Sequence, residues 1–185
     1  MIAHARAKAA ARGVARATVF HVGDIGDTRL HDAPYDGAIM MFAVLGYQQC
    51  DERVRAALAN ARTHLAAGAA LVFDVWYGPG VLADRPGPRR RSVETATGSI
   101  VRCAESQLDE SSNLCTVQYR IERWMNAKLT ESATERHVLR FFFPEEFGRF
   151  ATDCGFVCAA VRDFRCWHLP VNDASWHAIG VFRAL

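Results

Sequence analysis

The sequence lacks the features that identify several common classes of protein. Its formal net charge is only +2, with 22 basic and 20 acidic side chains in 185 residues, so composition favours neither a nucleic-acid nor a membrane-surface partner. No apolar run has the length of a membrane span, and no apolar segment follows the basic, Ala-rich start as it would in a signal peptide. We expect a cytoplasmic protein without a membrane partner; early arginines without an acid leave a mitochondrial presequence as the alternative.

The cysteines also lack an organising pattern. The six of them are scattered and form no Cys-x-x-Cys pair, which is typical of buried thiols in a reducing compartment rather than a disulfide framework. No histidine, cysteine and carboxylate cluster has metal-ligand spacing, so we expect no metal site. Half of the residues are apolar, and the length allows one domain with a substantial core.

The first part of the chain alternates between helical and strand patterns. Residues 1–12 and 51–67 have apolar positions at helical spacing, and residues 17–22, 38–42 and 69–75 form short apolar or β-favouring runs. Runs such as 38–42 suit strands buried on both faces of a sheet. The alternation predicts an α/β fold with parallel strands joined by crossovers. A doubly wound sheet normally begins with a strand, whereas this chain begins with a helix.

The middle of the chain has a different character. Gly78-Pro79-Gly80 breaks the pattern and is expected to open no helix, and side chains of 115–122 alternate between apolar and polar. This alternation is typical of antiparallel strands with one wet face. With turns at 109–113 and 125–128, residues of roughly 92–143 should form a three-stranded antiparallel insertion.

The final part returns to the α/β pattern. Pro144 should open a helix with a buried stripe of Phe147, Phe150, Ala151 and Cys154. Strands over 156–161 and 176–182 should close the sheet. We therefore expect a single domain over 1–185, in which 1–79 and 144–185 form the core and 80–143 form an insertion on the substrate side.

Ligands bind at the carboxyl ends of strands in open α/β sheets. Three such ends follow apolar runs directly: Gly23-Asp24-Ile25, the loop from Met41 to Tyr47, and Asp74-Val75-Trp76-Tyr77. They should line one rim of the sheet.

With these loops in place, the sequence resembles class I S-adenosyl-L-methionine-dependent methyltransferases. The resemblance is carried by MIAHARAKAAARG, FHVGDI, YDGAIMMFAVLGYQ, LAAGAALVFDVW and HVLRFFFPEEFGRFATDCGF. The last segment and the insertion before it are similar to the small-molecule subgroup, which includes sugar-nucleotide N-methyltransferases. The family's glycine-rich loop and its ribose-binding acid have no counterpart here. The resemblance thus implies an N-terminally truncated chain: a Rossmann-like doubly wound sheet lacking its first two strands, with a three-stranded antiparallel insertion.

The resemblance also implies roles for residues of the first two loops. Asp24 would accept a hydrogen bond from the adenine amine of S-adenosyl-L-methionine, and the Ile25 backbone N–H would meet a ring nitrogen. Met41 and Phe42 would face the methionine end of this cofactor, and Tyr47 would lie over the site. The alternatives are a turn role for Asp24 and core packing for Met41 and Phe42.

Methyl transfer depends mainly on positioning, and a general base helps when the acceptor is a protonated amine or a hydroxyl. His137 and Tyr47 are the candidate catalytic residues, with Tyr77 as a further candidate base. Trp76 and Tyr77 would wall a substrate pocket, and Arg140 would contact an anionic substrate. Each of these has a structural alternative in strand or core packing.

Three functions remain open. The first is S-adenosyl-L-methionine-dependent methyl transfer to an amine or hydroxyl of a small molecule, impaired by the truncation. The second is a non-catalytic remnant or regulatory partner that binds no cofactor. RNA binding through Arg89-Arg90-Arg91 is the third, although such a short basic run is more typical of a solvated loop. A homodimer is compatible with all three.

Overall fold

One twisted sheet contains every strand of the computed structural model, which describes residues 1–185. The strands follow each other in space in the order β3-β4-β5-β6-β2-β8-β7, and β1 pairs with β2. They are β1 (Tyr35–Met40), β2 (Leu65–Tyr77), β3 (Arg89–Thr95), β4 (Gly98–Asp109), β5 (Leu114–Met125), β6 (Lys128–Phe142), β7 (Phe156–Asp163) and β8 (His177–Ala184). The helices are α1 (Ile2–Ala11), α2 (Asp51–Thr63), α3 (Gly78–Ala83) and α4 (Pro144–Asp153), with 3₁₀ turns η1 (Ala15–Ala17) and η2 (Val44–Tyr47).

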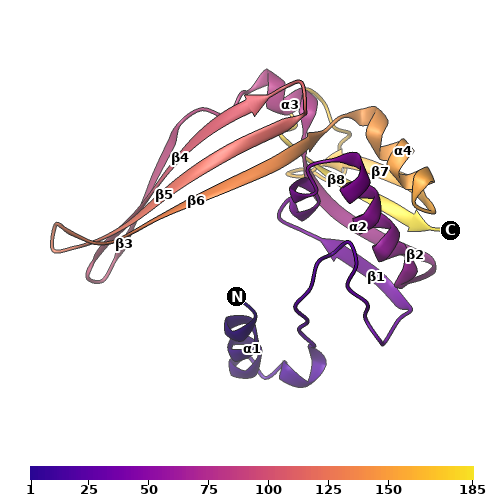
Figure 1. Cartoon of the computed structure of the whole chain (residues 1–185), viewed down its shortest axis with the longest axis horizontal. Coiled ribbons are helices and arrows are strands. Elements are labelled where there is room, and N and C mark those ends of the chain that lie inside the picture. The colour runs from indigo at the N-terminus through magenta and orange to yellow at the C-terminus, as the bar shows by residue number, and fades with distance from the viewer.

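Strand β2 is the centre of the sheet. Its pairs with β1 and β6 are parallel, and its pair with β8 is antiparallel. Both β1 and β6 lie on the edge opposite β8, with β1 along residues 65–73 and β6 only at Trp76 and Tyr77. The arm formed by β3–β6 therefore begins where β1 has ended, and it extends far from the body of the molecule (Figure 1).

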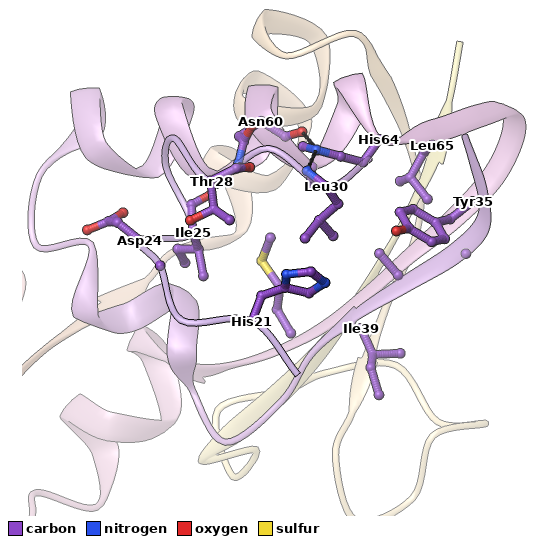
Figure 2. Close-up of a pocket in the computed structure, with 15 residues that line it drawn as sticks. His21, Asp24, Ile25, Thr28, Leu30, Tyr35, Ile39, Asn60, His64 and Leu65 are labelled. Atoms are coloured by element: carbon purple, nitrogen blue, oxygen red, sulfur yellow. Dashed lines mark hydrogen bonds between the residues drawn. The ribbon is translucent and has the colours of Figure 1, made fainter. Parts of the chain in front are cut away.

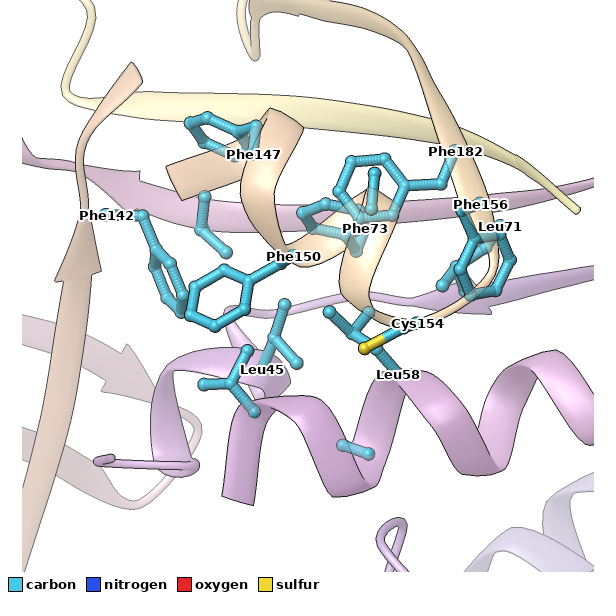
Figure 3. Packing of buried hydrophobic residues seen from close by; sticks show 14 of the residues in the cluster. Leu45, Leu58, Leu71, Phe73, Phe142, Phe147, Phe150, Cys154, Phe156 and Phe182 are labelled. Atoms are coloured by element: carbon cyan, nitrogen blue, oxygen red, sulfur yellow. The ribbon is translucent and has the colours of Figure 1, made fainter. Parts of the chain in front are cut away.

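The core lies between the sheet and helices α2 and α4 (Figure 3). Leu71, Phe73 and Val75 of β2 are buried there, because every second side chain of a strand points to the same face. Phe73 packs edge-to-face on Phe182 of β8, with ring centroids 4.8 Å apart, and stacks at 6.4 Å on Phe147 of α4. The predicted stripe of α4 is confirmed, since Phe147, Phe150, Ala151 and Cys154 are all buried.

The opposite face of the sheet is much less covered. Strand β1 begins at Tyr35 rather than at residue 38 and ends at Met40, and it pairs only with β2. Ile39 on this strand is 75% exposed, so the expectation of a strand buried on both faces is wrong. The sheet is mixed and mostly antiparallel, and helices α2 and α4 pack together on one of its faces. It therefore also differs from the doubly wound sheet that we expected.

Residues 17–22 form no strand, although their composition favours one. The chain runs irregularly from Thr18 to the turn at Ile25–Asp27. A strand needs a neighbour whose backbone groups complete its hydrogen bonds, and none of the strands pairs with this segment. The β propensity of residues 17–22 is therefore not sufficient to form a strand, because no neighbouring strand completes the hydrogen bonds of this segment.

Two boundaries after β1 also differ from expectation. Helix α2 ends at Thr63 rather than near residue 67, and β2 then runs through Gly68, whose φ of +79° favours glycine. Gly78-Pro79-Gly80 begins the short helix α3, contrary to the prediction. Proline is well tolerated in the first turn of a helix because its missing N–H would have no helical partner.

The insertion has four strands rather than three. Its turns at 109–113 and 125–128 are where the alternation predicted them, but β3 adds an antiparallel pair with β4 from Arg89 to Thr95. The basic run Arg89-Arg90-Arg91 is thus part of an exposed edge strand and not of a loop. The division of the chain into core and substrate-side insertion stays a prediction.

Candidate functional site

A cavity of about 550 Å³ lies at the carboxyl end of β1, where β6 takes the place of β1 beside β2. We call it the arm-side cavity. It gathers four residues predicted from the sequence, namely Phe42, Tyr47, Trp76 and His137. The other lining residues come from the arm (Arg102, Tyr119, Ile121, Glu135 and Leu139) and from the body (Ala43, Asp74, Phe164 and His177).

The chain leaves β1 through a sharp turn that faces this cavity. Phe42 and Ala43 both have left-handed backbone conformations, with φ of +68° and +54°. Non-glycine residues adopt this region only when surrounding contacts hold them there, at a cost on the order of 1–3 kcal/mol each. Here the Ala43 N–H donates a hydrogen bond of 3.0 Å to Asp74 Oδ2 of β2. The turn leads directly into η2, whose last residue is Tyr47.

Tyr47 and His137, two separate catalytic candidates in the sequence, lie together in the structure. The Tyr47 hydroxyl is 2.8 Å from His137 Nδ1, and His137 Nε2 is 3.3 Å from a carboxylate oxygen of Glu135. Burial, with smaller contributions from Tyr119 and Glu135, raises the pKa of Tyr47, so its phenol stays protonated and donates to Nδ1. With the Tyr47 hydroxyl as the donor to Nδ1, the tautomer of His137 that carries its proton on Nε2 donates to Glu135.

Aromatic residues form the part of the cavity that belongs to the body of the molecule. Trp76 packs edge-to-face on Trp176, with ring centroids 4.7 Å apart, and Phe164 lies 5.8 Å from His177. Burial lowers the pKa of His177, which favours its neutral form. The cavity thus combines apolar aromatic surfaces with a few polar groups, as small-molecule sites do.

Asp24 and Ile25 line a different cavity, of about 420 Å³, between residues 21–30, β1 and α2 (Figure 2). Asp24 Oδ1 accepts the Gly26 N–H at 2.8 Å, and Oδ2 is 3.6 Å from Arg53. In Figure 2 its carboxylate points away from the centre of the cavity. The neighbouring Met40, rather than the predicted Met41, belongs to its lining.

Two polar side chains of this second cavity, those of Asn60 and His64, are engaged with the chain itself. The Asn60 amide donates to the carbonyls of Ile25 and Thr28, and His64 Nε2 accepts the Leu30 N–H at 2.9 Å. No lining acid remains for ribose hydroxyls, and no glycine-rich loop approaches the cavity. These residues do not fit S-adenosyl-L-methionine, because its ammonium and sulfonium charges need an acidic partner, and Asp24, the one acid of the lining, points away from the centre of the cavity (Figure 2).

Tyr77 and Arg140 lie outside both cavities, contrary to their predicted roles in substrate binding. Tyr77 is part of the main core. The Arg140 side chain is 7% exposed, and it pairs with Asp51 at 2.7 Å and with Glu146. Its guanidinium therefore joins α2 and α4 to the arm and is not available to a substrate.

The arm-side cavity also contains residues to which the sequence assigned no individual role, chiefly Asp74, Tyr119 and His177. One of them had a visible signal. Asp74 is the only charged residue in the run LVFDVW, and a carboxylate inside a buried strand is expected only where something compensates its charge.

The structure carries no sign of two other kinds of site. None of its helices combines the length and apolar character needed to cross a bilayer. No three histidine, cysteine or acidic side chains are grouped so that they would hold a metal ion.

The fold is that of known methyltransferases. No family model matches the sequence, and a comparison with curated proteins finds no match. Among solved structures, an S-adenosylmethionine-dependent methyltransferase from Clostridium acetobutylicum has a TM-score of 0.82 at 13% identity, over 98% of this chain and 70% of that one. The methyltransferase CcbJ from Streptomyces caelestis has a TM-score of 0.79 at 19% identity, over 100% and 75% of the two chains. CalS10, an amino pentose methyltransferase from Micromonospora echinaspora, reaches 0.71 at 19%, over 95% and 70%.

Proposed function

We propose that this chain supplies the acceptor side of an S-adenosyl-L-methionine-dependent methyltransferase that acts on an amine or hydroxyl of a small molecule. The observation that carries this proposal is the 2.8 Å contact between Tyr47 and His137 in the cavity at the carboxyl end of β1. This is the end of the sheet at which ligands of α/β proteins bind. The fold shared with CalS10, which is described as an amino pentose methyltransferase, supports a small polar acceptor.

The residues of the cavity suit an acceptor that must lose a proton. When bound, the cofactor would supply the methyl group. An acceptor proton can pass to the Tyr47 oxygen while the phenolic proton moves to His137 Nδ1, and Glu135 then faces the imidazolium that results. Trp76 offers a flat apolar surface against which an acceptor ring can be held in line for displacement.

These 185 residues do not form a complete site for the cofactor. Since the second cavity has no free acid for the ribose hydroxyls and positive charges of S-adenosyl-L-methionine, we propose that methyl transfer by this chain alone is impaired. Isothermal calorimetry should detect no tight binding of the cofactor. A low-micromolar dissociation constant would contradict this part of the proposal.

The acceptor side can be tested in a longer chain that includes the in-frame coding sequence upstream of Met1. With radiolabelled S-adenosyl-L-methionine, we expect methyl transfer to a member of a panel of amino sugars, amines and alcohols. Substitution of the base, His137→Gln, should lower turnover by about 100-fold or more. The matched control is His31→Gln, in an exposed position outside both cavities, and it should leave turnover unchanged.

The poor fit of the second cavity also favours one alternative, a non-catalytic remnant or regulatory partner. A stop codon directly before Met1 would support it. A longer chain that binds neither the cofactor nor any acceptor would also support this alternative, because the added upstream residues would then not restore activity.

A further inference from the structure

Asp74 is an unusual charged residue for the place it occupies. It lies in β2 between the fully buried Phe73 and Val75, and it is 3% exposed. Because side chains alternate along a strand, its carboxylate points away from the core that Phe73 and Val75 fill. It lines the arm-side cavity instead.

The two oxygens of this carboxylate have different environments. Oδ2 accepts the Ala43 N–H and so holds the turn after β1. Oδ1 is buried and has no hydrogen-bond partner in the protein. A buried carboxylate is costly unless hydrogen bonds or a cation compensate its charge, and a single amide N–H is little compensation. The cavity side of Asp74 therefore lacks a cationic or N–H donor.

Neighbouring groups do not provide that positive charge. Burial lowers the pKa of His177 and keeps it neutral near pH 7. Arg102, the cation at the same cavity, is exposed, and its guanidinium lies 5.2 Å over the ring of Tyr119 without bonding to Asp74. The remaining surroundings include the aromatic rings of Trp76 and Phe164, whose faces attract cations.

We propose that Asp74 binds the protonated amine of the methyl acceptor through Oδ1, so that the cavity selects amines over alcohols. An ammonium group offers both the N–H donor and the positive charge that this oxygen lacks, whereas a neutral hydroxyl offers only a donor. The identification of the amine as a methyl acceptor rests on the function proposed above. The recognition of a cation by the cavity is independent of that function.

The test uses the 185-residue chain and two small probes of the same shape. Cyclohexylamine is protonated near pH 7, and cyclohexanol is neutral. Titrations are followed by ¹H–¹⁵N NMR at the amides of Ala43 and Trp76, which report on the turn and on the cavity. The wild-type chain should bind cyclohexylamine about tenfold more tightly than cyclohexanol, the difference expected for one hydrogen bond to a charged group. Equal affinities would overturn the proposal without the use of any variant.

Asp74→Asn separates recognition from structure. The asparagine oxygen can still accept the Ala43 N–H, so the turn should persist, and circular dichroism and the Ala43 amide shift check this. The preference for cyclohexylamine should disappear. Asp36→Asn, the same charge change at an exposed position of β1 outside the cavity, should keep it. A preference that survives in folded Asp74→Asn would overturn the proposal.

Arg102→Gln supplies a second control, because it removes the other cation of the cavity. If Asp74 is the recognition group, the affinity for cyclohexylamine should stay the same or increase. A loss would contradict the proposal, because a guanidinium has no acceptor for an ammonium group and repels its charge, so removing it cannot weaken recognition by Asp74. No cofactor is present in these titrations, so failure of methyl transfer and failure of amine recognition are separate results.

Discussion

At the scale of single residues, Arg140 shows how a charge can serve the fold in a place where a substrate contact was expected. Its side chain is 7% exposed and pairs with Asp51 of α2 and Glu146 of α4. Removal of one partner from a buried ion pair leaves the others uncompensated. We expect Arg140→Ala to lower the free energy of unfolding by about 3–5 kcal/mol, measured by urea denaturation.

The matched control for Arg140→Ala is Arg85→Ala. Arg85 also pairs with a glutamate, Glu110, at 2.6 Å, but both side chains are more than half exposed. Exposed pairs contribute about 1 kcal/mol or less, so this variant should be nearly neutral. Equal losses in the two variants would contradict the structural role assigned to Arg140.

His177 gives a pH-dependent prediction at the same scale. Burial lowers the pKa of His177 below its ordinary value of 6.5. As the pH falls below that value, the unfolded chain takes up a proton that the folded chain resists, so stability is lost until the folded pKa is passed. Wild type should therefore lose more stability between pH 7.5 and 5.5 than His177→Gln, which titrates in neither state. Parallel unfolding curves for the two chains over this range would exclude the effect.

The residues of the site could be predicted from the sequence only in part. Tyr47, Trp76 and His137 were selected because they follow strands or precede the aromatic run at 141–143, and the structure brings them to one cavity. The contact between Tyr47 and His137 spans 90 residues of sequence, and no local pattern encodes it. The predicted substrate contact of Arg140 is wrong because alternation along a strand predicts only the face on which a side chain lies. It does not predict the ion-pair partners, which here are on helices α2 and α4.

At the scale of elements, Gly180 marks a close approach between β8 and the core. A Cβ at this position would lie 2.3 Å from the Phe73 ring, which is already packed between Phe147 and Phe182. The ring has little room to move, so we expect Gly180→Ala to destabilise the fold by about 1–3 kcal/mol through overpacking. Thermal and urea unfolding would measure the loss.

Gly148→Ala is the control for this prediction. Gly148 lies on the exposed side of α4, and nothing is within 4 Å of the Cβ it would gain. Alanine is favoured over glycine in a helix by about 1 kcal/mol, so this variant should be neutral or more stable. If both alanines destabilise the chain equally, packing on Phe73 is not the cause of the loss at Gly180.

Elements with their own stop signals and buried stripe, such as α4 with Pro144 and Gly155, were predictable from the sequence. Elements that depend on a neighbour were not. Residues 17–22 have strand composition but no strand beside them, and residues 89–95 form a strand only because they pair with β4. Local propensity is a weak prior in both cases, since pairing decides whether the backbone groups are satisfied.

At the scale of the whole molecule, β1 is the part of the sheet most open to association. It pairs with β2 alone, and its other edge has no strand partner. Ile39 on this strand and Phe42 just after it are 75% and 93% exposed. Open edges with apolar side chains promote pairing between molecules. We therefore expect the 185-residue chain to associate as its concentration rises, which light scattering coupled to size exclusion would detect.

A charge placed on this strand should weaken the association, because natural sheets protect their edges with lysine. Ile39→Lys should shift the mass distribution toward the monomer, whereas Leu169→Lys, at a similarly exposed apolar position outside the strands, should not. Since Ile39 is exposed and the core lies on the other face of the sheet, Ile39→Lys should leave the unfolding temperature nearly unchanged. The decisive comparison is at equal concentration: a wild-type chain that stays monomeric throughout, or a Leu169→Lys variant that dissociates equally well, would show that β1 is not the surface through which the molecules associate.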